Sequence, residues 1–309
     1  MNKTLDLIAL GEPMMEFNQT RPGSPTYLQG FGGDTSNAAI AAARAGARVA
    51  YLTRLGQDHF GDALMALWAR ESVECQAVER DPDAATGIYF VHHSDAGHGF
   101  SYMRAGSAAT RMTPDCLNGL GWGQAIGRSR ILHLSGISMA ISRSACATSL
   151  QAMREARASQ TMVSFDSNLR LKLWSLKEAR AGITQAVALC DLFLPSLEDM
   201  EALTGLTDPD AIVDWSHAHG ARQVVLKMGE RGALLSDGHQ RQVVEGRPVQ
   251  LVDATGAGDC FCGNLLARLA LGDELLAATQ YANQAAALSV RGFGAVAPLP
   301  TRAEVLAVL

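Results

Sequence analysis

The chain has little charge and few aromatic residues for its length. Charged residues make up 18% of its 309 residues, aromatic residues make up 6%, and the formal net charge is −5. Nucleic-acid binding needs a strongly basic face, so this composition argues against a nucleic-acid partner. It does not exclude a small anionic substrate, which a few local arginines can hold.

Long apolar segments are also missing. No apolar stretch reaches the ~18 residues that a membrane span needs. Residues 1–10 lack the apolar core and the cleavage site of a signal peptide. We therefore expect a cytoplasmic protein with no membrane partner.

Metal-binding and disulfide patterns are absent as well. The eight histidines form no HExxH element, and the six cysteines form no CxxC pair. We expect reduced thiols and no structural zinc. The cysteines are Cys75, Cys116, Cys146, Cys190, Cys260 and Cys262.

Hydrophobic residues are plentiful, at 48% of the chain, and can fill a sizeable core. In the second half, short apolar runs alternate with longer amphipathic ones. This alternation indicates βαβ units, and hence an α/β fold with a mostly parallel central sheet flanked by helices. We expect strands at 131–134, 162–165, 192–194 and 224–227, and helices at 142–157, 175–189, 196–203 and 210–219.

The first half breaks that rhythm. Helices are expected at 35–45 and 58–70, with a strand at 49–53 between them. Residues 87–93 and 100–105 flank a turn rich in glycine, which predicts a hairpin. Residues 14–18 and 27–29 could pair with it. We infer a small sheet, built from about 12–32 and 85–108, that covers a site and excludes water. An ordinary antiparallel extension is the alternative.

The strongest local motif runs from Asp253 to Gly263 and leads into an apolar helix that reaches about Leu271. Its glycines let the backbone turn sharply. The unpaired amides of the first helical turn, with the helix dipole, make a site suited to phosphate. Asp259 in this turn is either a helix cap or a base. As a base it would take a proton from a hydroxyl that attacks the phosphate.

Two better-known phosphate loops do not fit this motif. A dinucleotide fingerprint starting at Gly256 needs glycine at 261, where Phe261 stands. A Walker loop starting at Gly258 needs Lys and Ser or Thr, where Asn264 and Leu265 stand. The motif therefore predicts a phosphate loop of another kind.

Two further segments carry weaker signals. Residues 30–37 combine glycines, which permit close approach of a ligand, with Asp34 and Asn37, which can hydrogen-bond hydroxyls. Asp34 or Thr35 could equally be a helix cap. Residues 227–232 form a glycine-containing turn after a strand, unremarkable on its own.

Together and in this order, these segments resemble the ribokinase-like, phosphofructokinase-B-type carbohydrate kinases over nearly the whole chain. Residues 32–39 look like the N-terminal signature, 55–61 like the following G-x-D-x-x-G element and 253–259 like the C-terminal signature, with Ala254 where threonine is common. The resemblance implies one ribokinase-like α/β domain over residues 1–309, with a small β-sheet lid.

The resemblance also implies a mechanism. Asp259 would be the general base, and the amides of Gly256, Ala257 and Gly258 would stabilise the transferring phosphoryl group. ATP would arrive with Mg²⁺. The nucleotide contacts carried over are Asn168, Lys227, Gly229, Gly232, Gly256, Gly258 and Asn283.

Two metal questions come with the resemblance. Asp253 and Thr255 match positions that bind a monovalent cation, K⁺, in several relatives; these residues could equally just shape the loop. The family often has an N-x-x-E element near magnesium, but Ser196 and Asp199 replace both of its key residues here. Asp199 still offers a carboxylate to a hydrated metal.

Within the family, residues 11–17, 102–109 and 165–174 most resemble the 2-keto-3-deoxygluconate kinases, although fructokinases largely share the last segment. The implied reaction is ATP-dependent phosphorylation of a sugar acid to its 6-phosphate. Arg104 and Arg170 could pair with the acid's carboxylate, although surface salt bridges would explain either arginine. Tyr102 and Arg104 share one strand face. The expected substrate contacts are Gly33, Asp34, Asn37, Tyr89, Tyr102, Arg104, Arg170 and Asp259.

The alternatives are a fructokinase or another sugar or nucleoside kinase on this scaffold, and a sugar-binding regulator that has lost turnover. The intact Gly256, Gly258 and Asp259 argue against the regulator. Because relatives often dimerise through their lids, a homodimer is also expected.

Overall fold

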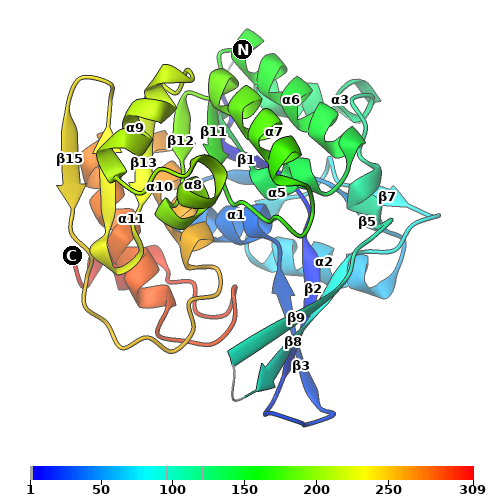
Figure 1. Cartoon of the computed structure of the whole chain (residues 1–309). Coiled ribbons are helices and arrows are strands. Elements are labelled where there is room, and N and C mark those ends of the chain that lie inside the picture. The colour runs from blue at the N-terminus through cyan, green and yellow to red at the C-terminus, as the bar shows by residue number, and fades with distance from the viewer. Residues whose placement is uncertain (1–2, 95–96, 120) are drawn as a thin grey trace.

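A large, mostly parallel sheet forms the centre of the computed structural model, which describes residues 3–94, 97–119 and 121–309 (Figure 1). Its strand order is β15-β14-β13-β12-β11-β10-β1-β4-β6, with β14 and β15 antiparallel at one edge. The strands are β1 Leu5–Leu10, β4 Val49–Leu52, β6 Val73–Glu74, β10 Ser129–Ser135, β11 Met162–Asp166, β12 Leu192–Leu194, β13 Gln223–Lys227, β14 Ala233–Ser236 and β15 Arg241–Val244.

Helices cover both faces of this sheet, because its central strands are apolar on both sides. In β1, Leu7 and Ala9 pack in one core cluster and Ile8 and Leu10 in the other. The first cluster is covered by α1 Asp34–Arg44, α2 His59–Arg70, α10 Ala257–Ala270, α11 Leu275–Ser289 and α12 Arg302–Leu306. The second is covered mainly by α4 Trp122–Gly127, α6 Arg143–Ala158, α7 Leu176–Leu189, α8 Leu197–Thr204 and α9 Pro209–Ala218, with the short α3 Cys116–Gly119 and α5 Gly136–Ala140.

A four-stranded sheet projects from this body (Figure 1). It has the order β3-β2-β8-β9, in which β2 runs antiparallel to β3 and parallel to β8. Its strands are β2 Met14–Gln19, β3 Tyr27–Gly32, β8 Ile88–Ser94 and β9 Gly97–Met103. The turn expected between β8 and β9 includes Asp95 and Ala96, which lie outside the described residues. A separate pair, β5 Arg54–Gly56 and β7 Glu79–Asp81, lies beside the body.

The predicted fold class is confirmed, and the expected strands and helices of the second half lie within one or two residues of those observed. The apolar run 249–252 before the phosphate motif is irregular backbone, and its Leu251 is 64% exposed. Its end is held to the body, because the amides of Val252 and Asp253 both donate to the carbonyl of Val290.

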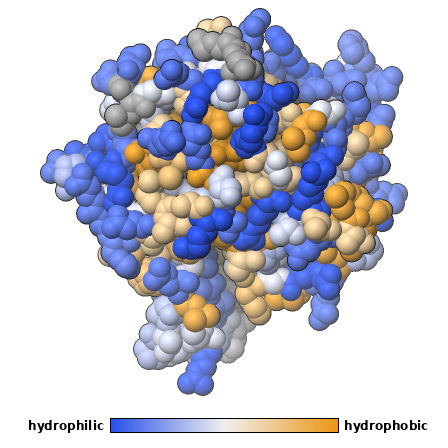
Figure 2. Space-filling model, turned by 180° about the vertical axis from the view of Figure 1, so that it is seen from behind, coloured by the Kyte–Doolittle hydropathy of each residue, from blue (hydrophilic) through white to orange (hydrophobic). Residues whose placement is uncertain are grey.

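The outer surface is mixed in character. Seen from behind, hydrophilic residues are interleaved with hydrophobic ones, as amphipathic covering helices produce (Figure 2). Of the helices in the described part of the chain, none combines the length and apolarity that crossing a bilayer requires.

Candidate active site

Two adjoining cavities open beside the carboxyl ends of β11 and β13. The first, of about 830 Å³, lies between the body and the small sheet. The second, of about 750 Å³, lies beside the turn after β13 and the start of α10. Both are lined by Lys227, Gly229, Ala254, Ala257 and Gly258. Molecules bound in the two cavities would therefore meet at the N-terminus of α10.

The turn at this N-terminus can bind an anion. Gly256 has φ +75°, and a Cβ there would lie 3.1 Å from the Cβ of Ala295, so glycine suits the position. The amide of Ala257 donates to the carbonyl of Ala254 at 3.2 Å. The amides of Gly256 and Gly258, in contrast, donate to no residue that the structure describes. Two of the three predicted anion-binding amides are thus open to a ligand.

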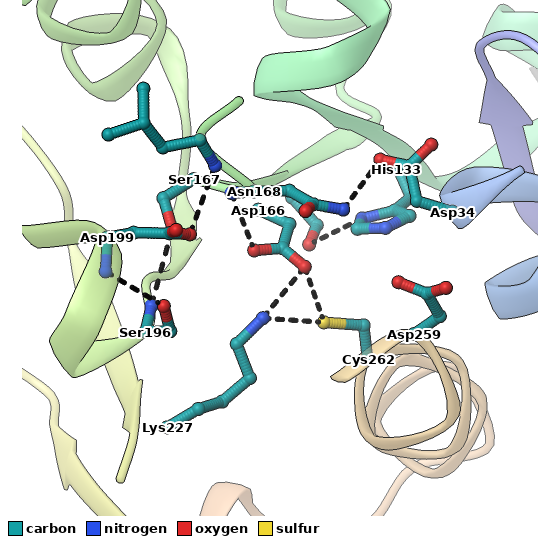
Figure 3. Close-up of polar contacts among 12 residues, drawn as sticks. Asp34, His133, Asp166, Ser167, Asn168, Ser196, Asp199, Lys227, Asp259 and Cys262 are labelled. Atoms are coloured by element: carbon teal, nitrogen blue, oxygen red, sulfur yellow. Dashed lines mark hydrogen bonds and ion pairs between the residues drawn. The ribbon is translucent and has the colours of Figure 1, made fainter. Parts of the chain in front are cut away.

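Asp259 lies in the first turn of α10 and faces the first cavity (Figure 3). Its Oδ2 accepts a hydrogen bond of 2.8 Å from Nδ2 of Asn37. Burial, and then the neighbouring carboxylate of Asp34, raise the pKa of Asp259 to about 7. A carboxylate with this pKa can accept a proton near neutral pH and release it again.

The first turn of α1 supplies the other polar wall. Gly33 has φ +106°, and a Cβ there would lie 2.5 Å from the carbonyl oxygen of Glu12, so only glycine fits. Oδ2 of Asp34 accepts from Nδ2 of Asn168 at 2.9 Å. Oδ1 of Asp34 and Oδ1 of Asn37 are buried, with no hydrogen-bond partner among the described residues. They can accept from ligand hydroxyls.

The small sheet contributes two tyrosines to the first cavity. The rings of Tyr89 and Tyr102 are stacked with their centroids 5.8 Å apart. The hydroxyl of Tyr89 donates to the buried carboxylate of Glu16. Since its proton is already used, Tyr89 can offer a ligand only acceptor lone pairs in this arrangement.

The two predicted carboxylate-binding arginines differ in their surroundings. Arg170 lines the first cavity and donates to the carbonyl of Leu169 at 2.8 Å. Arg104 adjoins the cavity, and its guanidinium donates to Glu12, whose side chain is 0% exposed and also accepts from Ser107. The charge of Arg104 is therefore already paired, while its buried Nε has no partner in the described chain.

Of the predicted nucleotide contacts, Lys227, Gly229, Gly232, Gly258 and Asn283 line the second cavity. Asn283 is buried, and its side chain donates to the carbonyl of Glu245 at 2.7 Å. Asn168 and Gly256 differ from these, because they line the first cavity instead, and Asn168 also holds Asp34.

The metal candidates are tied into the local backbone. Oδ1 of Asp253 accepts from both the amide and the hydroxyl of Thr255, and Oδ2 accepts from the amide of Gly294. Asp199, beside the first cavity, accepts from the hydroxyl of Ser167 at 2.7 Å and from the amide of Leu169 at 3.1 Å. Among the described residues there is no cluster of three or more His, Cys, Asp or Glu side chains placed to hold a metal.

Three carboxylates that line or support the site were not singled out from the sequence: Glu12, Glu16 and Asp166. Asp166 follows an apolar strand, and the carboxyl end of such a strand in an α/β sheet is where ligands bind, so a signal for it existed. The roles of Glu12 and Glu16 depend on partners 92 and 73 residues away, which no local pattern reveals.

Comparison with known proteins places this geometry in context. A family model described as "pfkB family carbohydrate kinase" matches residues 4–302. A 2-dehydro-3-deoxygluconokinase from Thermoproteus tenax is 33% identical, over 98% of this chain and 94% of that protein. Fructokinase-1 from Zea mays is 32% identical, over 97% of this chain and 96% of that protein. A fructokinase double mutant from Vibrio cholerae O395, solved with fructose, ADP and potassium ion, is 28% identical, covers all of both chains and superposes with a TM-score of 0.88.

The family match spans nearly the whole sequence, and the full-length relatives exceed 30% identity. The chain therefore belongs to the pfkB family of carbohydrate kinases.

Proposed function

We propose that this kinase phosphorylates the 6-hydroxyl of the sugar acid 2-keto-3-deoxygluconate with ATP. The observation that carries the chemistry is the placement of Asp259, which faces an acceptor cavity from a helical turn with open amides. A regulator without turnover would have no need of a carboxylate with a raised pKa at that position.

The transfer step follows from this placement. The acceptor hydroxyl gives its proton to Asp259, and its oxygen forms a bond to the γ-phosphorus of ATP as the bond to the β–γ bridging oxygen breaks. ADP leaves with the electron pair of that bond. The amides of Gly256 and Gly258 stabilise charge on the moving phosphoryl group. Asp34 and Asn37 orient the acceptor through its other hydroxyls.

ATP would occupy the second cavity, with its phosphates toward the N-terminus of α10. Mg²⁺ would accompany ATP and neutralise phosphate charge, and Asp199 offers a carboxylate to the hydrated metal although it departs from the family's N-x-x-E element. K⁺ would bind at Asp253 and Thr255. Both residues supply oxygen donors, which suit such an ion, but their mutual hydrogen bonds would also shape the loop without it.

The preference for a sugar acid rests on positive charge near the first cavity. Arg170 lines that cavity, as does Lys172, and a buried carboxylate needs such a partner. Fructose is the second candidate, and a specific observation favours it: Arg104 is already neutralised by Glu12, which leaves fewer cations free for an acid.

The small sheet is also the proposed dimer interface. It carries exposed apolar side chains on both faces, Leu28 on the face of Tyr89 and Tyr102 and Met103 on the opposite face, each 66% exposed. A second copy of the chain would cover them.

Coupled release of ADP, measured over a panel of sugar acids, sugars and nucleosides, tests the activity and the acceptor. Asp259→Asn should lower turnover by about 10²–10⁴-fold, the usual scale for loss of a general base, while ligand binding survives. Near wild-type turnover in that variant would assign the base to another residue. A wild-type preference for fructose would replace the sugar-acid assignment.

A further inference from the structure

A buried ion pair lies between the two cavities, and the transfer step above does not use it. Nζ of Lys227, at the end of β13, lies 2.7 Å from Oδ2 of Asp166, at the end of β11. The thiol of Cys262 donates to the same oxygen at 3.3 Å. Figure 3 shows Lys227 and Cys262 converging on Asp166. Burying such a pair is costly, so its position calls for an explanation.

The second oxygen of Asp166 holds a strained backbone. Oδ1 accepts from the amide of Asn168 at 3.2 Å. Asn168 has φ +26°, a backbone conformation that residues other than glycine rarely adopt. This conformation presents Nδ2 of Asn168 to Oδ2 of Asp34, which lies in the acceptor wall. Asp166 is thereby connected through Asn168 to the acceptor cavity.

Lys227 makes the complementary connection. Its side chain is part of the lining of both cavities, beside the amides at the start of α10. Burial alone would lower the pKa of this ammonium group, but the charge of Asp166 raises it above the ordinary value. Lys227 therefore stays positive at the place where the phosphoryl group would cross.

We propose that Asp166 is a positioning residue that aligns the two halves of the site. One of its carboxylate oxygens fixes Lys227 against the transferring phosphate. The other oxygen fixes Asn168, and through it Asp34, against the acceptor. The proposal rests on the proposed phosphoryl transfer for its kinetic consequences, but not for its effect on nucleotide binding. Asp166 itself lines the first cavity, but in this role it acts through Lys227 and Asn168.

The alternative is that Asp166 only stabilises the sheet edge. Asp6→Asn is a matched control for that role, because Asp6 is also a buried aspartate on a central strand, paired with Arg48. It is the second residue of β1, at the opposite end of the strands from the cavities. Both substitutions should lower the melting temperature, whereas only Asp166→Asn should change kinetics.

The first experiment measures kcat and KM with the preferred acceptor for wild type, Asp166→Asn and Asp6→Asn. Asp166→Asn should lower kcat by about 10²-fold, the scale of misplacing groups by about 1 Å. It should also weaken ADP binding, measured by calorimetry. Asp6→Asn should leave both unchanged. If the two variants behave alike, Asp166 is structural and the proposal is overturned.

The second experiment uses the pH dependence of kcat/KM, which reports the charges that face Asp259. The charged groups that face Asp259 are Asp34 on α1, Asp166 on β11 and Lys227 on β13. Asp166→Asn removes a negative neighbour, so the acidic limb should move to lower pH. Lys227→Met removes the positive one, so the limb should move to higher pH. Shifts of the same sign would contradict the proposal.

The outcomes separate this proposal from the proposed function. If the wild type phosphorylates no tested sugar, the function fails while the calorimetric comparison of ADP binding still decides the role of Asp166. If the wild type is active and ADP binds equally well to Asp166→Asn, the positioning role fails alone.

Discussion

Removing Arg104 tests how the small sheet recognises the substrate, because this residue pairs with Glu12 and is also proposed to bind the substrate carboxylate. Arg104 is 10% exposed in its side chain and Glu12 is 0% exposed. Arg104→Ala would leave Glu12 as a buried carboxylate without its cation. Deleting one partner of a buried pair costs about 3–5 kcal/mol of unfolding free energy.

Proton uptake limits this cost. Burial already raises the pKa of Glu12, and loss of Arg104 would raise it further, which favours proton uptake by the carboxyl. The double variant Glu12→Gln/Arg104→Ala contains no buried charge here. It should recover much of the lost stability, measured by urea unfolding, and so provides a background in which binding can be assayed.

Relative to Glu12→Gln, in which the charge of Arg104 is unpaired, the double variant should lose about 2–4 kcal/mol of transition-state binding for 2-keto-3-deoxygluconate, measured as kcat/KM; this is the range for truncating one partner of a desolvated charge pair. The loss for fructose should be much smaller. Single Glu12→Gln separates the contribution of Glu12 from that of the arginine. Equal losses with both substrates would show that Arg104 only supports the structure of the small sheet and does not bind the carboxylate of the sugar acid.

Three further predictions concern the catalytic carboxylate, the cation and the lid. The pKa of Asp259 is raised from 3.8 to about 7, so kcat/KM should rise with pH through about 7. The same shift makes the folded protein lose stability as the pH rises from 3.8 to about 7, because the folded state keeps the proton longer than the unfolded state. Asp259→Asn should therefore melt above wild type at pH 8 but not at pH 4. Exchanging K⁺ for tetramethylammonium should lower activity reversibly, and Asp253→Asn should abolish the dependence on K⁺; unchanged activity without K⁺ would leave Asp253 only its role in the loop. Sedimentation should give a two-chain mass, which Met103→Lys reduces to one; a monomeric wild type would exclude the lid dimer.

The parts of the site that could be predicted from the sequence are the local ones. The turn at Gly256 and the carboxylate of Asp259 lie within four residues, so backbone freedom, free amides and a base could be inferred together. The strand and helix pattern of the second half was likewise readable, because parallel strands buried on both faces leave continuous apolar runs. Central strand β1 was not among the expected strands, and its place between β10 and β4 depends on long-range pairing.

Local sequence patterns could not predict which charged side chains pair with one another in the folded protein. Tyr89 lies on β8 as expected, whereas β9 ends at Met103, so Arg104 follows the strand and does not share a strand face with Tyr102. Glu16 and Glu12 determine what Tyr89 and Arg104 can still donate. An arginine selects a carboxylate only with charge that its own protein has not already neutralised. Arg170 has no carboxylate partner among the described contacts, so the discrimination between an acid and a neutral sugar should depend more on this residue than the strand pattern around Arg104 suggested.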